Sequence, residues 1–235
     1  MDITYIIYVL PAIILSLVAQ YMVKNRFATY SKVQSSKGLT GAQAASLLLK
    51  ANGIYDVSIH HITGSLTDNY NPSDKTLNLS DSTYASTSIA AIGVAAHETG
   101  HAIQHKVGYS PLSLRSTLVP IANIGSRFGP TMAILGLAFG YSAQSSAGLW
   151  QMVTNIGLVL FACAVLFYIV TLPVEFNASS RALKILKTTG TLTETELSGV
   201  KKVLWAAAMT YVASALTAIG NLVRLLVLTS RRRDD

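Results

Sequence analysis

The chain has 235 residues, of which 51% are hydrophobic and only 12% are charged. An ordinary soluble domain carries about 25% charged residues, so the composition argues against a soluble protein. The net charge of +7 comes from lysines and arginines that flank apolar stretches, which is typical of membrane proteins and gives no indication of nucleic-acid binding. The single cysteine, Cys163, excludes a disulfide framework and a cysteine-based zinc site within one chain.

Three stretches without Asp, Glu, Lys, Arg or His predict membrane-spanning helices. Residues 3–23 form the first, and their flanks favour a retained anchor over a cleaved signal peptide. Residues 128–174 are long enough for two helices joined by a polar turn near 142–148. Residues 203–223 form the last. The sequence therefore predicts about four transmembrane helices.

The polar segment that follows the first span predicts a small domain with helices and strands. Thr40 is placed to cap a helix that extends through Lys50. Residues 55–62 and 76–80 have the pattern of short strands, and a turn-rich stretch separates them. We expect this domain to be α+β in a chain that is otherwise mainly α.

Residues 88–105 read SIAAIGVAAHETGHAIQH and predict a helix capped by Ser88. His97 and His101 are one turn apart on one face of that helix, so both imidazoles can bind one metal ion. Glu98 lies beside them. H-E-x-x-H is a zinc-peptidase signature, and although it also occurs by chance, a carboxylate among small apolar residues is costly without a partner. The pattern predicts one Zn²⁺ per chain, with Glu98 as the base that activates the metal-bound water.

The remaining histidines are poor candidates for a third ligand. His105 lies eight residues after His97, about 12 Å along a helix, which is too far to share an ion. His60 and His61 lie in a predicted strand and point to opposite faces, so we expect exposed side chains there.

Glu175 is the strongest candidate for the third ligand because it follows a predicted span, where an acidic residue needs a reason. Glu194 and Glu196 compete, but their segment has the pattern of a capped, solvated helix. Two spans are predicted between His101 and Glu175, which would place both on the same side of the membrane.

The distribution of basic residues predicts that this side is cytoplasmic. Lysines and arginines follow the first span and surround the segment after the third. The basic residues Arg231–Arg233 would then lie outside, and the positive-inside rule does not explain them.

Five blocks in order resemble the YugP-type zinc metallopeptidases of bacterial membranes, a neutral zinc metallopeptidase family: residues 39–57, 69–80, 90–105, 118–126 and 171–186. The resemblance covers nearly the whole chain and is far more specific than H-E-x-x-H alone. It implies a peptidase of the bacterial inner membrane, but it does not identify a substrate.

The block around Glu175 also resembles the gluzincin pattern, in which a Glu on a second helix completes the zinc site. Gluzincins often place an Asp four residues later to orient a ligand histidine, whereas this sequence has Ser179 there and Asn177 two residues after the Glu. Arg181 is a candidate for supporting the ligand carboxylate or the oxyanion, and an equally good candidate for a basic membrane anchor.

The strand at 76–80 precedes the metal helix, where many zincins have an edge strand that binds peptide. We expect it to pair with an extended substrate, such as an unfolded or membrane-protein segment. The residues concerned are Thr76, Leu77, Asn78, Leu79 and Ser80.

The expected protein is thus a multi-pass, mainly α membrane protein with a small α+β zincin-like metallopeptidase domain. Its expected partners are the lipid bilayer and a peptide or protein substrate. The alternative is a non-proteolytic membrane scaffold with a structural zinc site. The predicted segments are an anchor at 1–23, the α+β domain at 24–115, two spans at 116–174, the third-ligand segment at 175–202, and a last span with its basic tail at 203–235.

Overall fold

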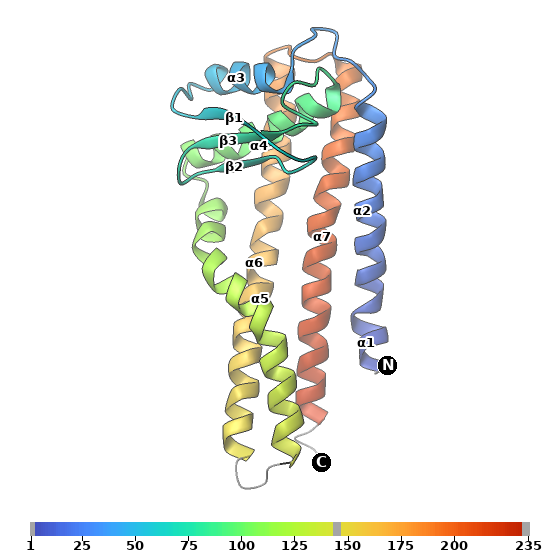
Figure 1. Cartoon of the computed structure of the whole chain (residues 1–235), viewed down its shortest axis with the longest axis vertical. Helices are drawn as coiled ribbons and strands as arrows, with labels where there is room; N and C mark the ends of the chain where they lie inside the picture. Colours follow the sequence, from blue (N-terminus) through green and yellow to red (C-terminus); the bar gives the residue numbers. More distant parts are fainter. Residues whose placement is uncertain (1–2, 143–146, 232–235) are drawn as a thin grey trace. The chain divides into compact units, whose positions relative to one another are not determined.

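The computed structural model describes residues 3–142 and 147–231 and is mainly helical, as predicted (Figure 1). The helices are α1 (Ile3–Tyr8), α2 (Leu10–Tyr30), α3 (Gly41–Ala51), α4 (Ile89–Lys106), α5 (Ser110–Ser142), α6 (Ala147–Thr188) and α7 (Glu194–Arg231). The strands are β1 (Ser58–Ile62), β2 (Asn69–Asn71) and β3 (Thr76–Ser80). Most of the turn predicted near 142–148, and the end of the basic tail, lie outside the described residues.

The chain divides into two compact units. One unit comprises Met1–Val18, Leu114–Leu172 and Tyr211–Asp235, and the other comprises Ala19–Ser113 and Pro173–Thr210. We call the first the helical unit and the second the α+β unit. The α+β unit contains the sheet, α3 and α4, together with the end of α6 and the beginning of α7.

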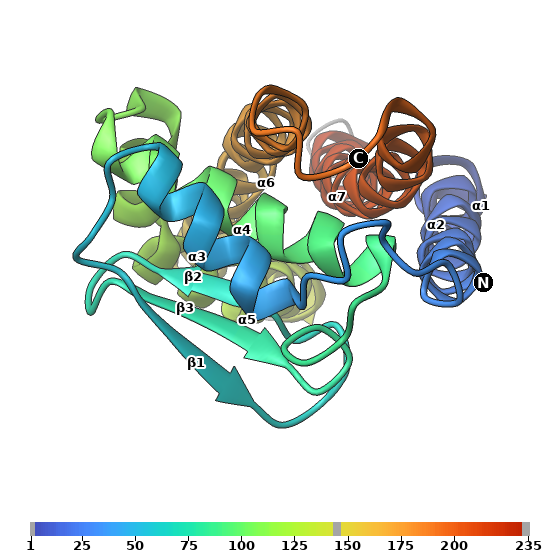
Figure 2. The same cartoon turned by 90° about the horizontal axis from the view of Figure 1, so that it is seen from above.

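The sheet of the α+β unit has three strands in the order β1-β3-β2. β1 is parallel to β3, with Ser58 opposite Thr76, and β2 is antiparallel to β3, with Tyr70 opposite Leu77. α3 and α4 lie side by side next to this sheet, α3 against β1 and α4 against β2 and β3 (Figure 2). This arrangement places α4, which carries the H-E-x-x-H motif, beside the short strand β2.

The expectation that residues 76–80 form an edge strand is wrong. The strand exists with the predicted bounds, but it is the central strand of the sheet and is paired on both sides. Immediately before the start of β2, the carboxylate of Asp68 accepts hydrogen bonds from the backbone N–H of Ser80 (2.8 Å) and from its hydroxyl (2.9 Å). Thr76, Leu77, Asn78, Leu79 and Ser80 therefore do not form an edge for an added peptide strand, and the edge beside α4 belongs to β2.

The predicted caps form, and they fix where the helices of the α+β unit begin. Thr40 and Gln43 form a reciprocal capping box at the start of α3. The hydroxyl of Ser88 accepts from the N–H of Ala91 (3.2 Å) at the start of α4. Leucines, isoleucines and alanines of α3, β3, α4, α6 and α7 pack into one buried core, so that the sheet, α4 and the end of α6 share an interior.

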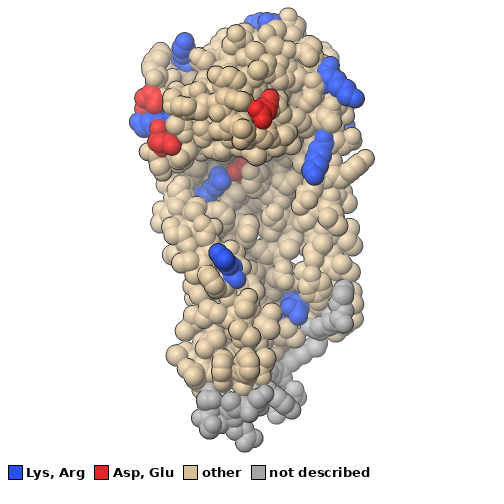
Figure 3. All heavy atoms as spheres, in the orientation of Figure 1, with Lys and Arg blue, Asp and Glu red and all other residues tan. Residues whose placement is uncertain are grey.

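Three of the described helical segments are long and apolar enough to cross a membrane: Ile3–Tyr30, Gly148–Thr188 and Glu194–Ser230. Three of the about four predicted spans therefore correspond to helices that could cross a membrane, whereas α5 does not qualify. α5 contains Arg115 and Arg127 as well as two prolines, Pro120 and Pro130, which together lower its apolar character. Figure 3 shows how few charged side chains lie on one face of the chain.

Candidate metal centre

α4 carries three of the predicted site residues in a buried stretch of helix. The helix is rich in alanine, which favours helix formation, and most of its residues from Ile89 to Gln104 are buried. Glu98 and His101 are both 8% exposed. Because the helix is capped at Ser88 and packed in the core, the side chains one turn apart have a fixed position.

A glycine allows α6 to approach this part of α4. A Cβ atom on Gly100 would lie 2.5 Å from the carbonyl oxygen of Ala178, a distance that real Cβ atoms do not reach. The backbones of α4 and α6 are therefore in close contact at Gly100 and Ala178. Gly100 is next to His101, and Ala178 lies in the segment that carries Glu175 and Ser179. This contact brings together residues that are far apart in the sequence.

Three candidate ligands lie together at this contact: His97, His101 and Glu175. Oε2 of Glu175 is 3.2 Å from Nε2 of His97 and 3.6 Å from Nε2 of His101, and the three ligand atoms lie within 4.8 Å of one another. Ligands about 2 Å from one tetrahedral ion are about 3.3 Å apart, so these spacings fit a shared zinc ion. Glu175 is only 2% exposed, and a buried carboxylate needs such partners.

The other ring nitrogens of the two histidines have different partners. Nδ1 of His97 is 3.1 Å from the hydroxyl of Ser179, and Nδ1 of His101 is 3.0 Å from Oε1 of Gln104. Since an amide oxygen only accepts, His101 donates from Nδ1 and keeps the lone pair of Nε2 free for a metal. Ser179 thus contacts a candidate ligand histidine at the position where gluzincins often have Asp.

Gln104 connects this histidine to α6, and the sequence analysis missed it. Its side-chain NH₂ donates to the carbonyl of Val174 (2.8 Å) and to Oδ1 of Asn177 (3.0 Å). The same Oδ1 accepts from Nε of Arg181 (2.7 Å). Asn177 and Arg181 therefore belong to a polar chain that ends on His101, and neither has a described hydrogen bond to Glu175. The sequence does contain one sign of this role: Gln104 is a polar residue three positions after the second histidine on a largely apolar helix.

Burial and nearby charges shift the acid–base properties of α4. Burial raises the pKa of Glu98 above its ordinary value, although the two histidines act in the opposite direction. Burial lowers the pKa of His101, but its hydrogen bond to Glu175 and the charges of Glu98 and Glu175 outweigh this effect, so that the pKa is raised. Glu98, His101 and Glu175 therefore act on one another's charge in this buried site.

The other candidates for ligands are engaged elsewhere. Nδ1 of His105 is 2.8 Å from the hydroxyl of Tyr70. His60 contacts Ser58, and His61 contacts Asp81.

The two later glutamates stabilise the start of α7. Glu194 pairs with Lys187 (2.8 Å), and Glu196 accepts from the N–H of Thr193 (2.7 Å) and from the N–H of Ser36 (2.6 Å). This is the capped, solvated helix that the sequence predicts, and it leaves Glu175 as the carboxylate of the described cluster.

Comparisons with known proteins match the chain along nearly its whole length. Residues 5–230 match the family described as "Putative neutral zinc metallopeptidase". The chain is 42% identical to the "Putative membrane protease YugP" of Bacillus subtilis (strain 168) over 231 residues, which is 98% of this chain and 99% of that protein. No solved structure matches the chain.

Proposed function

We propose that this chain, which belongs to the family described as "Putative neutral zinc metallopeptidase", is a membrane-embedded zinc peptidase that hydrolyses peptide bonds. Its proposed active site consists of His97, Glu98, His101 and Glu175. The observation that carries the proposal is the convergence of two imidazole nitrogens and one buried carboxylate oxygen. Two histidines and one glutamate leave a coordination position open, whereas structural zinc sites usually have four protein ligands.

The residues fit one zinc ion. His97, His101 and Glu175 supply two nitrogens and one oxygen, a donor set that suits zinc, and both Nδ1 atoms have partners that orient the rings. When bound, zinc supplies Lewis-acid polarisation of the scissile carbonyl and makes water more acidic.

Glu98 is the proposed general base and acid. It follows His97 directly and it is buried, a position from which its carboxylate would accept a proton from water and later return it to the leaving amine. Glu175 would balance part of the positive charge of a bound zinc ion. The hydrogen bonds that join Arg181, Asn177 and Gln104 position His101. Arg181 therefore acts through other residues rather than on the substrate.

β2 is the proposed edge for an extended substrate. It pairs with β3 on one side only, and it contacts α4, which carries the histidines. Peptides that add to such an edge are recognised through their backbone, which suits unfolded chains or segments of membrane proteins.

The same cluster bears on how the chain crosses the membrane. His101 and Glu175 are neighbours, and the apolar part of α6 precedes Glu175. Because His101 and Glu175 lie together, both must be on the same side of the membrane. If the apolar part of α6 crosses the bilayer, the segment between His101 and α6 must therefore cross it as well, and α5 is the helix in that segment. We therefore place α5 as a fourth crossing, despite its prolines, and the catalytic face on the cytoplasmic side, where the basic residues after α2 are expected.

The alternative function is a membrane scaffold in which zinc only stabilises the fold. A structural site has no use for Glu98, since this residue is not among the three clustered ligands. The peptidase therefore accounts for one more buried charged residue than the scaffold does.

The experiment that tests the proposal measures zinc content and casein hydrolysis for the full-length wild type, Glu98→Gln and Glu175→Ala. Glu98→Gln should keep about one zinc per chain and lose at least about 100-fold in hydrolysis, because the ligands remain and the base is removed. Glu175→Ala should lose both zinc and hydrolysis.

Hydrolysis that survives in Glu98→Gln would contradict the role of Glu98. Zinc bound by every form, with no hydrolysis by any, would favour the scaffold.

A further inference from the structure

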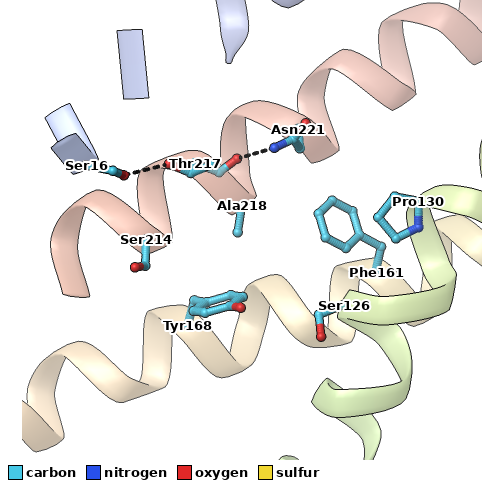
Figure 4. A pocket seen from close by; sticks show the side chains of 9 residues that line it. All are labelled: Ser16, Ser126, Pro130, Phe161, Tyr168, Ser214, Thr217, Ala218 and Asn221. Atoms are coloured by element: carbon cyan, nitrogen blue, oxygen red, sulfur yellow. Dashed lines mark hydrogen bonds between the residues drawn. The ribbon is translucent and has the colours of Figure 1, made fainter. Parts of the chain in front are cut away.

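A cavity of about 460 Å³ lies in the helical unit, which contains apolar parts of α2, α6 and α7 (Figure 4). Its volume falls within the roughly 300–1,000 Å³ that is usual for ligand sites. Six of the nine lining residues carry a hydroxyl or an amide, and none is charged: Ser16, Ser126, Tyr168, Ser214, Thr217 and Asn221. A polar cavity is unexpected among apolar helices, because polar groups at membrane depth need partners.

A proline removes the usual helical donor from a backbone carbonyl of a residue that lines the cavity. Pro130 lies inside α5 and has no N–H, so it cannot donate to the carbonyl of Ser126, four residues earlier in the helix. Both residues line the cavity. In hydrocarbon, a backbone carbonyl deprived of its helical donor needs another one.

The polar side chains of the cavity keep capacity for further hydrogen bonds. The hydroxyl of Thr217 donates to Ala213 of its own helix (2.8 Å), and Asn221 donates to the carbonyl of Thr217 (3.0 Å). Ser16 and Thr217 are joined across α2 and α7 at 3.3 Å. Each hydroxyl oxygen has two lone pairs, so these oxygens can accept more. Within the described residues, no hydrogen bond is recorded for the hydroxyl of Tyr168, which faces the cavity in Figure 4.

The chemistry of the lining selects the kind of ligand. An uncharged wall offers no charge to balance that of a phosphate or a metal ion within a bilayer. It offers several neutral acceptors and a few donors, which match the alternating N–H and C=O groups of a peptide backbone. In a bilayer, these backbone groups are exposed only where a transmembrane helix is unwound.

We propose that the cavity binds an unwound stretch of a transmembrane segment of a substrate protein, through hydrogen bonds to the peptide backbone. The side chains of Ser126 and Ser214 are exposed, so such a segment can enter from the side. That the bound segment belongs to a substrate rests on the peptidase function proposed above. The binding itself does not depend on that function, and it can be measured without cleavage.

The test uses the full-length Glu98→Gln protein in phosphatidylcholine nanodiscs. The probes are two dansyl-labelled peptides of leucine and alanine, long enough to span, of which one has a central Gly-Pro that unwinds the helix. Binding is followed by energy transfer from the tryptophans of the protein. The Gly-Pro peptide should bind at least about tenfold more tightly than the uniform peptide, as expected for two or three hydrogen bonds within a membrane.

Variants of the cavity should remove this preference. Ser126→Leu and Ser214→Leu fill the cavity and should weaken binding of the Gly-Pro peptide about tenfold. Tyr168→Phe, which removes only a hydroxyl, should weaken it about threefold. Ser230→Leu is the matched control, since it is an exposed serine of α7 outside the cavity, and it should bind like the parent protein.

Equal binding of both peptides, or cavity variants that bind like the parent, would overturn the proposal and leave a cavity filled by water or lipid. Casein hydrolysis by the same variants in an active background is measured in parallel. Selective binding without any hydrolysis would keep the binding site and contradict the peptidase, whereas hydrolysis without selective binding would do the reverse.

Discussion

The two candidate ligand histidines occupy one helix but depend on different neighbours. The partner of His97 is the hydroxyl of Ser179, which can rotate, whereas the partner of His101 is the amide of Gln104, whose NH₂ is fixed by two acceptors. Gln104 is fully buried, so it has no water to replace a lost partner. The orientation of His101 should therefore be the more sensitive of the two.

Replacing Gln104 by Leu should weaken zinc binding about 10- to 100-fold, because it removes the acceptor that fixes the ring of His101. Gln104→Glu keeps an acceptor at the same place and should bind zinc more tightly than Gln104→Leu. The measurement is competition with a chelating dye, together with the visible spectrum of the cobalt-substituted protein, which reports ligand geometry.

Gln20→Leu, an exposed glutamine on α2, is the control and should bind zinc like the wild type. A folded Gln104→Leu variant with the affinity and cobalt spectrum of the wild type would show that the hydrogen bond does not position His101.

At the scale of elements, the candidate site depends on how closely α4 approaches α6. Gly100 is the residue that permits this approach, since any side chain there meets the backbone of Ala178. Backbone atoms cannot turn aside as a flexible side chain can. The helices themselves would have to move apart, and α4 carries the two candidate histidines whereas α6 carries Glu175.

Gly100→Ala should therefore lose zinc, even though alanine favours helix formation. Overpacking of this kind costs about 1–3 kcal/mol, and a small separation moves Glu175 away from both histidines. Zinc content after dialysis and the unfolding midpoint measure the two effects.

Gly148→Ala is the matched control. It lies in α6, where a Cβ atom would meet nothing within 4 Å, so zinc content should not change. Full zinc occupancy in Gly100→Ala would contradict the close contact between the helices.

At the scale of the whole molecule, metal binding should add to stability, because the candidate ligands come from two helices that a bound ion would connect. Removal of zinc with a chelator should lower the unfolding midpoint, and added zinc should restore it. A free metal concentration 100 times the dissociation constant should raise the free energy of unfolding by about 2.7 kcal/mol. His97→Ala is the control and should show little change with chelator. An equal midpoint for the wild type with and without metal would contradict the prediction.

The sequence predicted those features that depend on short-range spacing. The spans follow from runs of apolar residues, the caps at Thr40 and Ser88 from local patterns, and the pair His97 and His101 from the helical repeat. Glu175 could also be selected, because the apolar second half of the chain contains few carboxylates.

Features that depend on long-range pairing could not be predicted in this way. The order of the strands places β3 between two partners, although nothing within residues 76–80 distinguishes a central strand from an edge strand. β2 lies in a turn-rich stretch and exists only because it pairs with β3. The role of Gln104 requires knowledge that α6 lies beside α4, and that contact depends on a glycine.

The separation of the ligands along the chain has a consequence for biogenesis. His97 and Glu175 are 78 residues apart, so the ribosome completes α4 before it makes the carboxylate. At 5–20 residues per second, the nascent chain would hold only the two histidines for roughly 4–16 s. Two imidazoles alone are a weak zinc site, so a chain that is still being synthesised should remain without metal and inactive until the helix bearing Glu175 has been made.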